Sequence, residues 1–176
     1  MSLSQDKPTR ILFVCLGNIC RSPTAEAVFR HKAGQAGWHN LLQADSAGTA
    51  AWHVGKVPDA RSQQHGRERG YDLSSLRARQ VTTADFSDFD HILAMDADNL
   101  AELEKLRQQA AAAGQGRTAR LGLLLDEHPD TAGRDVPDPY YGGPAGFDEV
   151  IDLIETATDA LLRRLLKARG VFGCGC

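Results

Sequence analysis

The sequence predicts an α/β fold in which a parallel sheet carries helices on both faces. The first observation is that four strand-like segments alternate with four helix-like segments along the chain, an order typical of strand–helix–strand units. The second is the short, unbroken apolar run Ile11–Val14, which resembles a strand buried on both faces. Ligands of such folds bind beyond the carboxyl ends of the strands, so the residues after Val14 form the first candidate site.

The first half of the chain predicts two helices separated by a weaker strand. Pro23–Ala36 carries apolar residues at helical spacing and is followed by Gly37, which favours a helix stop. Leu41–Asp45 is the weaker strand. Asp59–Arg69 has a helical pattern and also ends at a glycine.

The second half predicts two further strand–helix pairs. Phe89–Met95 is a strand, and Asp96–Ala112 is a helix with its aspartate as N-cap. Arg120–Leu125 is the last apolar strand. A long amphipathic helix then covers about Phe147–Arg169, with basic residues near its end, as the helix dipole favours.

Length and composition predict one domain over residues 1–176, with flexible tails at about 1–9 and 171–176. The net charge of −3 argues against a nucleic-acid or membrane-surface partner. No apolar stretch approaches the roughly 20 residues that cross a bilayer. The polar segment Met1–Arg10 has no apolar signal-peptide core, so we expect a cytoplasmic protein.

The loop after the first strand combines a thiol with a guanidinium. Cys15 and Arg21 are separated by five residues, and the pair Ser22-Pro23 is typical of an N-cap followed by the first helical position. Backbone N–H groups at a helix N-terminus bind anions, and the same field favours a thiolate. Arg21 supplies a planar fork that suits two phosphate oxygens. The pattern predicts a phosphate-binding loop with a nucleophilic thiolate.

Attack of a thiolate on a phosphate ester requires an acid that protonates the leaving oxygen. The candidate is Asp138 in the long loop 126–146, where prolines flank it and Tyr140 and Tyr141 follow it. The alternative is a simple turn, because Asp-Pro and Gly-Gly are common turn formers. Asp130 and Asp135 are rival acids in the same loop.

The chain resembles the low molecular weight protein tyrosine phosphatases, and the resemblance covers most of its length. Its two most specific motifs are the cysteine loop and the distant Asp-Pro-Tyr-Tyr-Gly. The matching stretches are Val14–Pro23, Asp45–Gly48, Pro58–Arg61, Ala78–Val81, Ala94–Asp96 and Asp138–Gly142. The resemblance implies a four-stranded parallel sheet with a phosphate-binding loop after the first strand. It also implies hydrolysis of phosphotyrosine in a protein or peptide, and of small aryl phosphates, without metal or cofactor.

The resemblance assigns roles to individual residues. Cys15 is implied to be the nucleophile that forms a phosphocysteine, Arg21 to bind the phosphoryl oxygens, and Asp138 to act as acid and then base. Ser22 is implied to hydrogen-bond the thiolate. The loop residues implied to surround the phosphate, or another oxyanion, are Leu16, Gly17, Asn18, Ile19 and Cys20. Residues implied to brace the loop are Asn18 and Ser46, and those implied to wall an aryl ring are Trp52, Tyr140 and Tyr141.

One position departs from the family pattern. Many members carry a histidine in the network that braces the loop asparagine, whereas this chain has Leu76 there. We therefore expect a shorter network. Cys20 is expected either to protect Cys15 from over-oxidation by forming a disulfide, or to pack under the loop as a small buried residue.

Three other functions remain open. The first is an arginine-phosphate phosphatase, which resembles family members that carry a small polar residue at the position of Ile19. Arsenate reductase shares the loop but needs relay cysteines, for which Cys174 and Cys176 are the candidates. A catalytically silent phosphate-binding module is the third. A zinc site does not fit the cysteine spacing.

Overall fold

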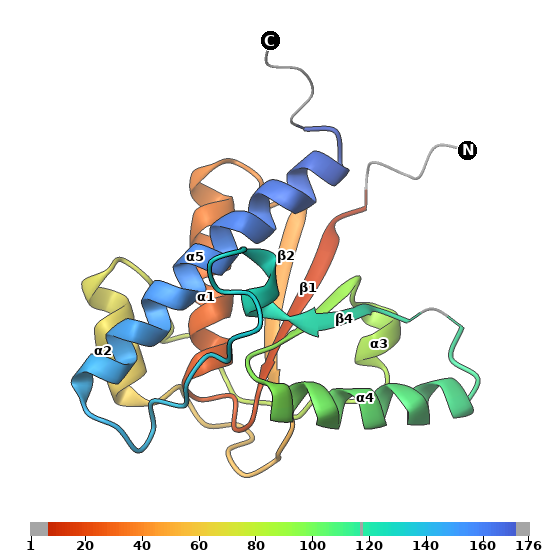
Figure 1. The fold of residues 1–176 in the computed structure, drawn as a ribbon, viewed down its shortest axis with the longest axis horizontal. Coiled ribbons are helices and arrows are strands. Elements are labelled where there is room, and N and C mark those ends of the chain that lie inside the picture. The colour runs from red at the N-terminus through yellow and green to blue at the C-terminus, as the bar shows by residue number, and fades with distance from the viewer. Residues whose placement is uncertain (1–6, 117, 172–176) are drawn as a thin grey trace.

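The computed structural model describes residues 7–116 and 118–171, which fold around a four-stranded parallel sheet. The strands lie in the order β2 (Leu42–Gly48), β1 (Thr9–Cys15), β3 (His91–Ala94) and β4 (Arg120–Leu123) (Figure 1). In this register Phe13 lies opposite Ser46 on one side and Leu93 on the other. The predicted fold class is confirmed.

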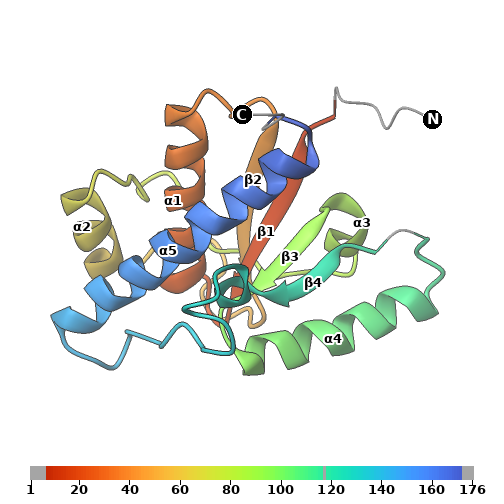
Figure 2. The same ribbon diagram turned by 45° about the horizontal axis from the view of Figure 1, so that its top comes forward.

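Helices cover both faces of the sheet, as Figure 2 shows. One face carries α1 (Arg21–Gln35), α2 (Ala60–Glu68) and α5 (Pro144–Ala168), and the other carries α3 (Asp85–Asp88) and α4 (Ala97–Ala112). The side chains of β1 alternate between two cores: Phe13 packs toward α1 and α5, and Leu12 toward the α3 side. No helix within residues 7–116 and 118–171 has the length and apolar character to cross a membrane.

Several element boundaries differ from the prediction, and β2 runs to Gly48 rather than ending at Asp45. β1 begins at Thr9, so the strand reaches into the predicted 1–9 tail; residues 1–6 and 172–176 lie outside the described part. β4 ends at Leu123, because Leu124 and Leu125 turn into the core as part of the 3-10 helix η1 (Leu124–Glu127). The four-residue α3 was not predicted, being too short to show a helical period.

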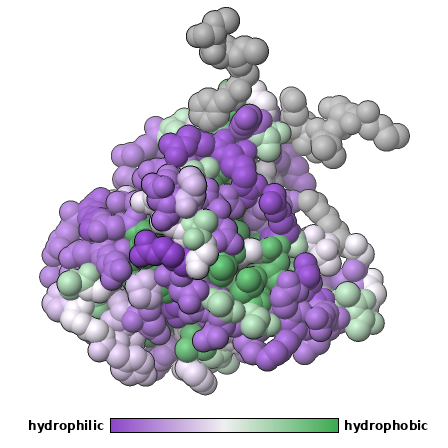
Figure 3. Space-filling view, viewed as in Figure 1, coloured by the Kyte–Doolittle hydropathy of each residue, from purple (hydrophilic) through white to green (hydrophobic). Residues whose placement is uncertain are grey.

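Most of the surface in the view of Figure 3 is hydrophilic, and its apolar part lies at one edge of the sheet. Figure 3 shows a largely hydrophilic face on which apolar side chains gather near β4. This strand is an edge of the sheet, and its Leu121 and Leu123 are only partly buried. The cysteine loop lies away from that edge, after β1 at the centre of the sheet.

The carboxyl ends of three strands meet around that loop. Gly48 at the end of β2 lies so close that an added Cβ would be 2.7 Å from the carbonyl oxygen of Leu16 and 3.2 Å from the amide nitrogen of Asn18. Only glycine permits this approach without displacing the loop. Asp96, just after β3, lies on the opposite side of the loop and contacts Arg21.

Candidate active site

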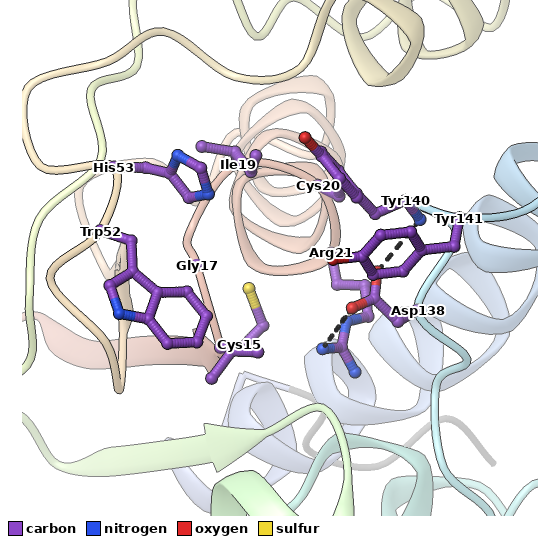
Figure 4. Close-up of a pocket in the computed structure, with 11 residues that line it drawn as sticks. Cys15, Gly17, Ile19, Cys20, Arg21, Trp52, His53, Asp138, Tyr140 and Tyr141 are labelled. Carbon is purple, nitrogen blue, oxygen red and sulfur yellow. Dashed lines mark hydrogen bonds and ion pairs between the residues drawn. The ribbon is translucent and has the colours of Figure 1, made fainter.

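The loop between β1 and α1 curls around the thiol of Cys15. Asn18 adopts φ 55°, a left-handed conformation that no other non-glycine residue in the described part of the chain adopts. Its backbone N–H donates to the sulfur of Cys15 at 3.3 Å. Cys15 is buried, and Figure 4 shows its sulfur pointing into the pocket. The loop therefore aims the thiol at the cavity and surrounds it with hydrogen-bond donors.

Helix α1 begins two residues earlier than predicted, and Ser22 does not cap it. The N-cap is Cys20, which makes no side-chain capping hydrogen bond. The Ser22 hydroxyl lies 3.0 Å from the sulfur of Cys15 and accepts from Asn18 Nδ2 at 2.8 Å. The prediction of a Ser22 cap was wrong because the hydroxyl is engaged with the thiol. The amide groups of the first turn are left without a side-chain cap, a state that suits an anion.

A buried hydrogen-bond network braces the loop from below. Asn18 Nδ2 also donates to Ser46 Oγ at 3.0 Å, and Asn18 Oδ1 accepts from the Arg79 backbone N–H at 3.0 Å. Ser46 Oγ in turn donates to Glu26 at 2.6 Å. Asn18 and Ser46 thus occupy the bracing positions expected of them, while the Asn18 side chain faces the network rather than the cavity.

Glu26 is a site-supporting residue that sequence reasoning missed. It is buried on α1, and burial raises the pKa of its carboxyl group even though Ser46 and Arg30 act in the opposite direction. Leu76, at the position where the family resemblance led us to look for a histidine, is partly buried and packs against the apolar core. The sequence could have indicated Glu26, because it lies four residues after Ser22 on the face of α1 that carries Ala25 and Phe29.

We expect Asn18→Ala to lower kcat by about 10- to 100-fold, the range for a catalytic group displaced by about 1 Å. Alanine loses the side-chain hydrogen bonds to Ser22 and Ser46 and is also strained at φ 55°. Asn18→Gly is the matched variant, because it tolerates the backbone conformation but still lacks the hydrogen bonds. Steady-state kinetics and thermal unfolding of both separate the two causes. Wild-type kcat in Asn18→Gly would show that the hydrogen bonds contribute nothing to turnover.

Arg21 is buried and held by groups from two other segments. Its Nη1 donates to Asp96 Oδ2 at 2.5 Å and to the Val136 carbonyl oxygen at 3.1 Å, and its Nη2 lies 3.7 Å from Asp138 Oδ2. Burial disfavours the charged guanidinium, but the nearby Cys15 and the two carboxylates outweigh it, so the pKa of Arg21 is raised. The guanidinium is thereby held charged beside the thiol.

Asp96 has a role beyond the predicted one. Its Oδ1 accepts from the Asn99 N–H at 2.7 Å, which confirms the predicted N-cap of α4. Its Oδ2 orients Arg21, a contact that sequence reasoning missed. In the sequence, the contact was indicated only by the position of Asp96 directly after a buried strand, since site residues of parallel sheets lie beyond the carboxyl ends of the strands.

Asp138 reaches the pocket, whereas its rivals do not. Its Oδ1 accepts from the Tyr140 N–H at 3.1 Å. The loop that carries it is held by a hydrogen bond from Val136 N to the carbonyl oxygen of Met95, the residue after β3, at 2.8 Å. Asp135 accepts from the Ala97 N–H at 3.0 Å and so lies at the start of α4. The side chain of Asp130 is 86% exposed. Neither rival lines the pocket.

The pocket has a volume of about 230 Å³, with the sulfur of Cys15 at its base (Figure 4). Its predicted walls lie at the rim: Trp52 is 70% exposed and Tyr141 is 92% exposed, and Tyr140 lies edge-on to Tyr141 with ring centroids 4.9 Å apart. Predicted loop residues that line it are Leu16, Gly17, Ile19 and Cys20. The arrangement suits a flat group whose charged end reaches the loop.

His53 is a lining residue that was not predicted. Its ring lies over Gly17, where an added Cβ would approach His53 Cδ2 to 2.9 Å. His53 belongs to no recognised motif, so the sequence gives no reason to distinguish it from an ordinary surface histidine.

Cys20 is a free, buried thiol at the N-cap of α1. Burial raises its pKa to about 12, although a hydrogen bond with Ser62 acts in the opposite direction. Cys20 is therefore protonated at neutral pH. Both thiols line the pocket, and Figure 4 shows the sulfur of Cys15 pointing into it.

These features define a class of protein: an α/β protein in which a cysteine and an arginine share an anion-binding loop at the carboxyl end of the first strand. The model of the family described as low molecular weight phosphotyrosine protein phosphatase matches residues 10–170. The chain belongs to this family.

Known relatives support the assignment along nearly the whole chain. The low molecular weight protein-tyrosine-phosphatase YfkJ of Bacillus subtilis is 44% identical over 90% of this chain and 97% of that protein. A solved structure of a protein tyrosine phosphatase from Entamoeba histolytica, with Hepes in the active site, has a TM-score of 0.81 at 39% identity, covering 92% of this chain and 99% of that chain. A structure described as a Drosophila arginine phosphatase has a TM-score of 0.79 at 35% identity, covering 88% and 96%.

Proposed function

We propose that this protein hydrolyses phosphotyrosine in proteins or peptides through a phosphocysteine intermediate on Cys15. The observation that carries the proposal is the convergence of Cys15, Arg21 and Asp138 on one pocket with an aromatic rim. The family assignment adds support, since relatives are named protein-tyrosine-phosphatases.

In the first proposed step the phosphate lies on the amides at the start of α1 and on the Arg21 guanidinium. The sulfur of Cys15 attacks phosphorus and the bond to the phenolic oxygen breaks. Asp138, in its protonated form, gives its proton to that oxygen, so the product leaves as a neutral phenol. The Arg21–Asp138 contact of 3.7 Å supports a carboxyl group positioned beside the leaving group.

In the second proposed step water attacks the phosphocysteine and Asp138 accepts its proton. The bond between phosphorus and sulfur breaks, which returns the thiolate and releases inorganic phosphate. Ser22 stabilises the departing thiolate, because its one hydrogen is available to the sulfur at 3.0 Å, with the Ala47 carbonyl at 3.3 Å as the alternative acceptor. No metal or cofactor takes part in the proposed reaction.

The shape of the site supports an aryl phosphate over shorter esters. A phosphoserine side chain is short, while the phosphate loop lies at the bottom of the pocket, behind Trp52 and Tyr141. Phosphoarginine is the second candidate substrate, supported by the similarity to a structure described as an arginine phosphatase. The apolar Ile19 in the pocket favours the flat phenyl ring. The relay cysteines that arsenate reduction would need, Cys174 and Cys176, lie outside the described residues.

The test is a panel of one peptide carrying phosphotyrosine, phosphoserine or phosphoarginine at matched concentration. We expect kcat/KM to be highest for phosphotyrosine. Comparable values for phosphoserine would contradict the proposed specificity, a preference for phosphoarginine would favour the second candidate, and no turnover on any peptide would indicate a silent phosphate-binding module.

The proposed setting is the cytoplasm, with a role in phosphotyrosine signalling. Two free thiols in the site, Cys15 and Cys20, support a reducing compartment, because a thiolate nucleophile is lost on oxidation. Cell fractionation with activity measurement would test the location.

Cys20 is proposed to protect Cys15 from over-oxidation. Peroxide converts the Cys15 thiolate to a sulfenic acid, and condensation with the Cys20 thiol would form a disulfide and release water. After peroxide and then reductant, we expect activity to recover in the wild type but poorly in Cys20→Ser, with sulfinic or sulfonic acid on Cys15 by mass spectrometry. Equal recovery would leave Cys20 with a packing role alone.

A further inference from the structure

Arg61, in the first turn of α2, makes contacts that the proposed chemistry does not use. The carbon of its guanidinium group lies 5.4 Å from the ring centroid of Tyr140 and 4.8 Å from that of Phe147. Tyr140 belongs to the segment that carries Asp138, and Phe147 lies in the first turns of α5. The guanidinium therefore lies against both ends of the segment that leads from the acid into α5.

The other side of Arg61 is joined to the phosphate loop. Its Nε and Nη2 donate to the two carboxylate oxygens of Asp59, both at 3.0 Å. The Asp59 backbone N–H donates to the Ile19 carbonyl oxygen at 2.8 Å, and the Asp59 side chain caps α2. Arg61 thus links, through Asp59, the loop that holds the phosphate to the segment that holds the acid.

The acid segment has little other support on this side. Asp138, Tyr140 and the residues from 141 to 145 are exposed, while Pro139 is buried. The Asp138 carboxylate accepts from the Tyr140 N–H at 3.1 Å, so the orientation of the carboxylate depends on where the Tyr140 backbone lies. A contact that fixes Tyr140 is therefore expected to fix the carboxylate too.

We propose that Arg61 is a positioning residue for the general acid, holding the Asp138 segment against the phosphate loop through Tyr140 and Asp59. The inference rests on the proposed function of Asp138. The role requires a planar guanidinium, which can pair with a carboxylate edge-on while its faces contact aromatic rings. A lysine at this position keeps the charge but loses the bidentate pair and most of the stacking.

The test compares Arg61→Met and Arg61→Lys on phenyl phosphate and on p-nitrophenyl phosphate. Phenolate is the poorer leaving group and depends more on protonation, so misplacing the acid should affect phenyl phosphate more. We expect Arg61→Met to lower kcat on phenyl phosphate by about tenfold or more and on p-nitrophenyl phosphate by less. Arg61→Lys should lie between Arg61→Met and wild type.

Arg69→Met is the matched control. Arg69 is the C-cap of α2 and also pairs with carboxylates of α5, those of Asp148, Asp152 and Glu155. Within the described chain it has no ion pair with Asp59 and no cation–π contact with Tyr140, the two contacts on which the proposed role of Arg61 depends. We expect its kcat on both substrates to stay within about twofold of wild type, as for surface positions away from a site. Thermal unfolding of each variant confirms that the compared proteins are folded.

A second measurement separates positioning from a general structural effect. In an Asp138→Ala background the acid is absent, so Arg61→Lys should cause no further loss on phenyl phosphate. An equal loss on the two substrates, or the same loss with and without Asp138, would overturn the role of Arg61. Failure of the wild type to hydrolyse either substrate would instead overturn the proposed function.

Discussion

Replacing Cys15 with serine is expected to abolish turnover while leaving phosphate binding intact. A serine hydroxyl is not ionised at neutral pH, so the group that attacks phosphorus is lost even though its position is kept. The donors to this position, the Asn18 N–H and the Ser22 hydroxyl, stabilise a negative sulfur and do not suffice to ionise an alcohol. We expect kcat to fall below detection in a phosphotyrosine peptide assay.

Binding should survive because the anion site is built from other groups. Arg21 stays held by Asp96 and Val136, and the start of α1 keeps its free amides. Calorimetric titration with phosphate or vanadate should give affinity comparable to that of the wild type for phosphate. Appreciable turnover in Cys15→Ser, with the protein verified by mass, would refute the phosphocysteine mechanism.

Asp138→Ala is expected to lower kcat by roughly 10²–10⁴-fold on phenyl phosphate, the contribution typical of a positioned general acid. The reason is that phenolate leaves poorly without a proton. The loss should be smaller on p-nitrophenyl phosphate, whose leaving group is stable as an anion. The measurement is the ratio of the two losses, taken from steady-state kinetics at one pH.

Asp130→Ala is the matched control, since Asp130 lies in the same loop and its side chain points to solvent. It should retain wild-type kcat within about twofold. An equal loss on both substrates in Asp138→Ala would mean that Asp138 only shapes the loop, as the simple turn predicted from its prolines would do.

The sequence predicted the sheet, most helices and the three central site residues, because each rests on a local pattern. The apolar run of β1, the Cys-x5-Arg spacing and the proline-flanked Asp138 can be read within a few residues. The meeting of the carboxyl ends of β1, β2 and β3 at one edge then follows from parallel strands, whereas the strand order β2-β1-β3-β4 was not predicted and comes from the structure.

What the sequence could not predict depends on contacts between distant segments. Ser22 has the local pattern of an N-cap, but the thiol of Cys15 and the amide of Asn18 engage its hydroxyl in the folded chain. Asp96 was predicted as a cap, and its second oxygen meets Arg21 across 75 positions of sequence. No periodic pattern in the sequence predicts the contact between Arg61 and Tyr140.

The uncapped start of α1 has a consequence for the stability of the fold. Its first-turn amides have no side-chain cap and lie beside a buried cysteine and arginine, an arrangement that a bound oxyanion would stabilise. Any oxyanion that binds the folded loop and not the unfolded chain adds RT ln(1 + [L]/Kd) to the unfolding free energy, or about 2.7 kcal/mol at one hundred times Kd. Inorganic phosphate, the product of the proposed reaction, would thus both inhibit turnover and stabilise the folded chain. The same occupancy that slows turnover would protect the fold, so catalysis and thermal resistance would vary in opposite directions with phosphate concentration.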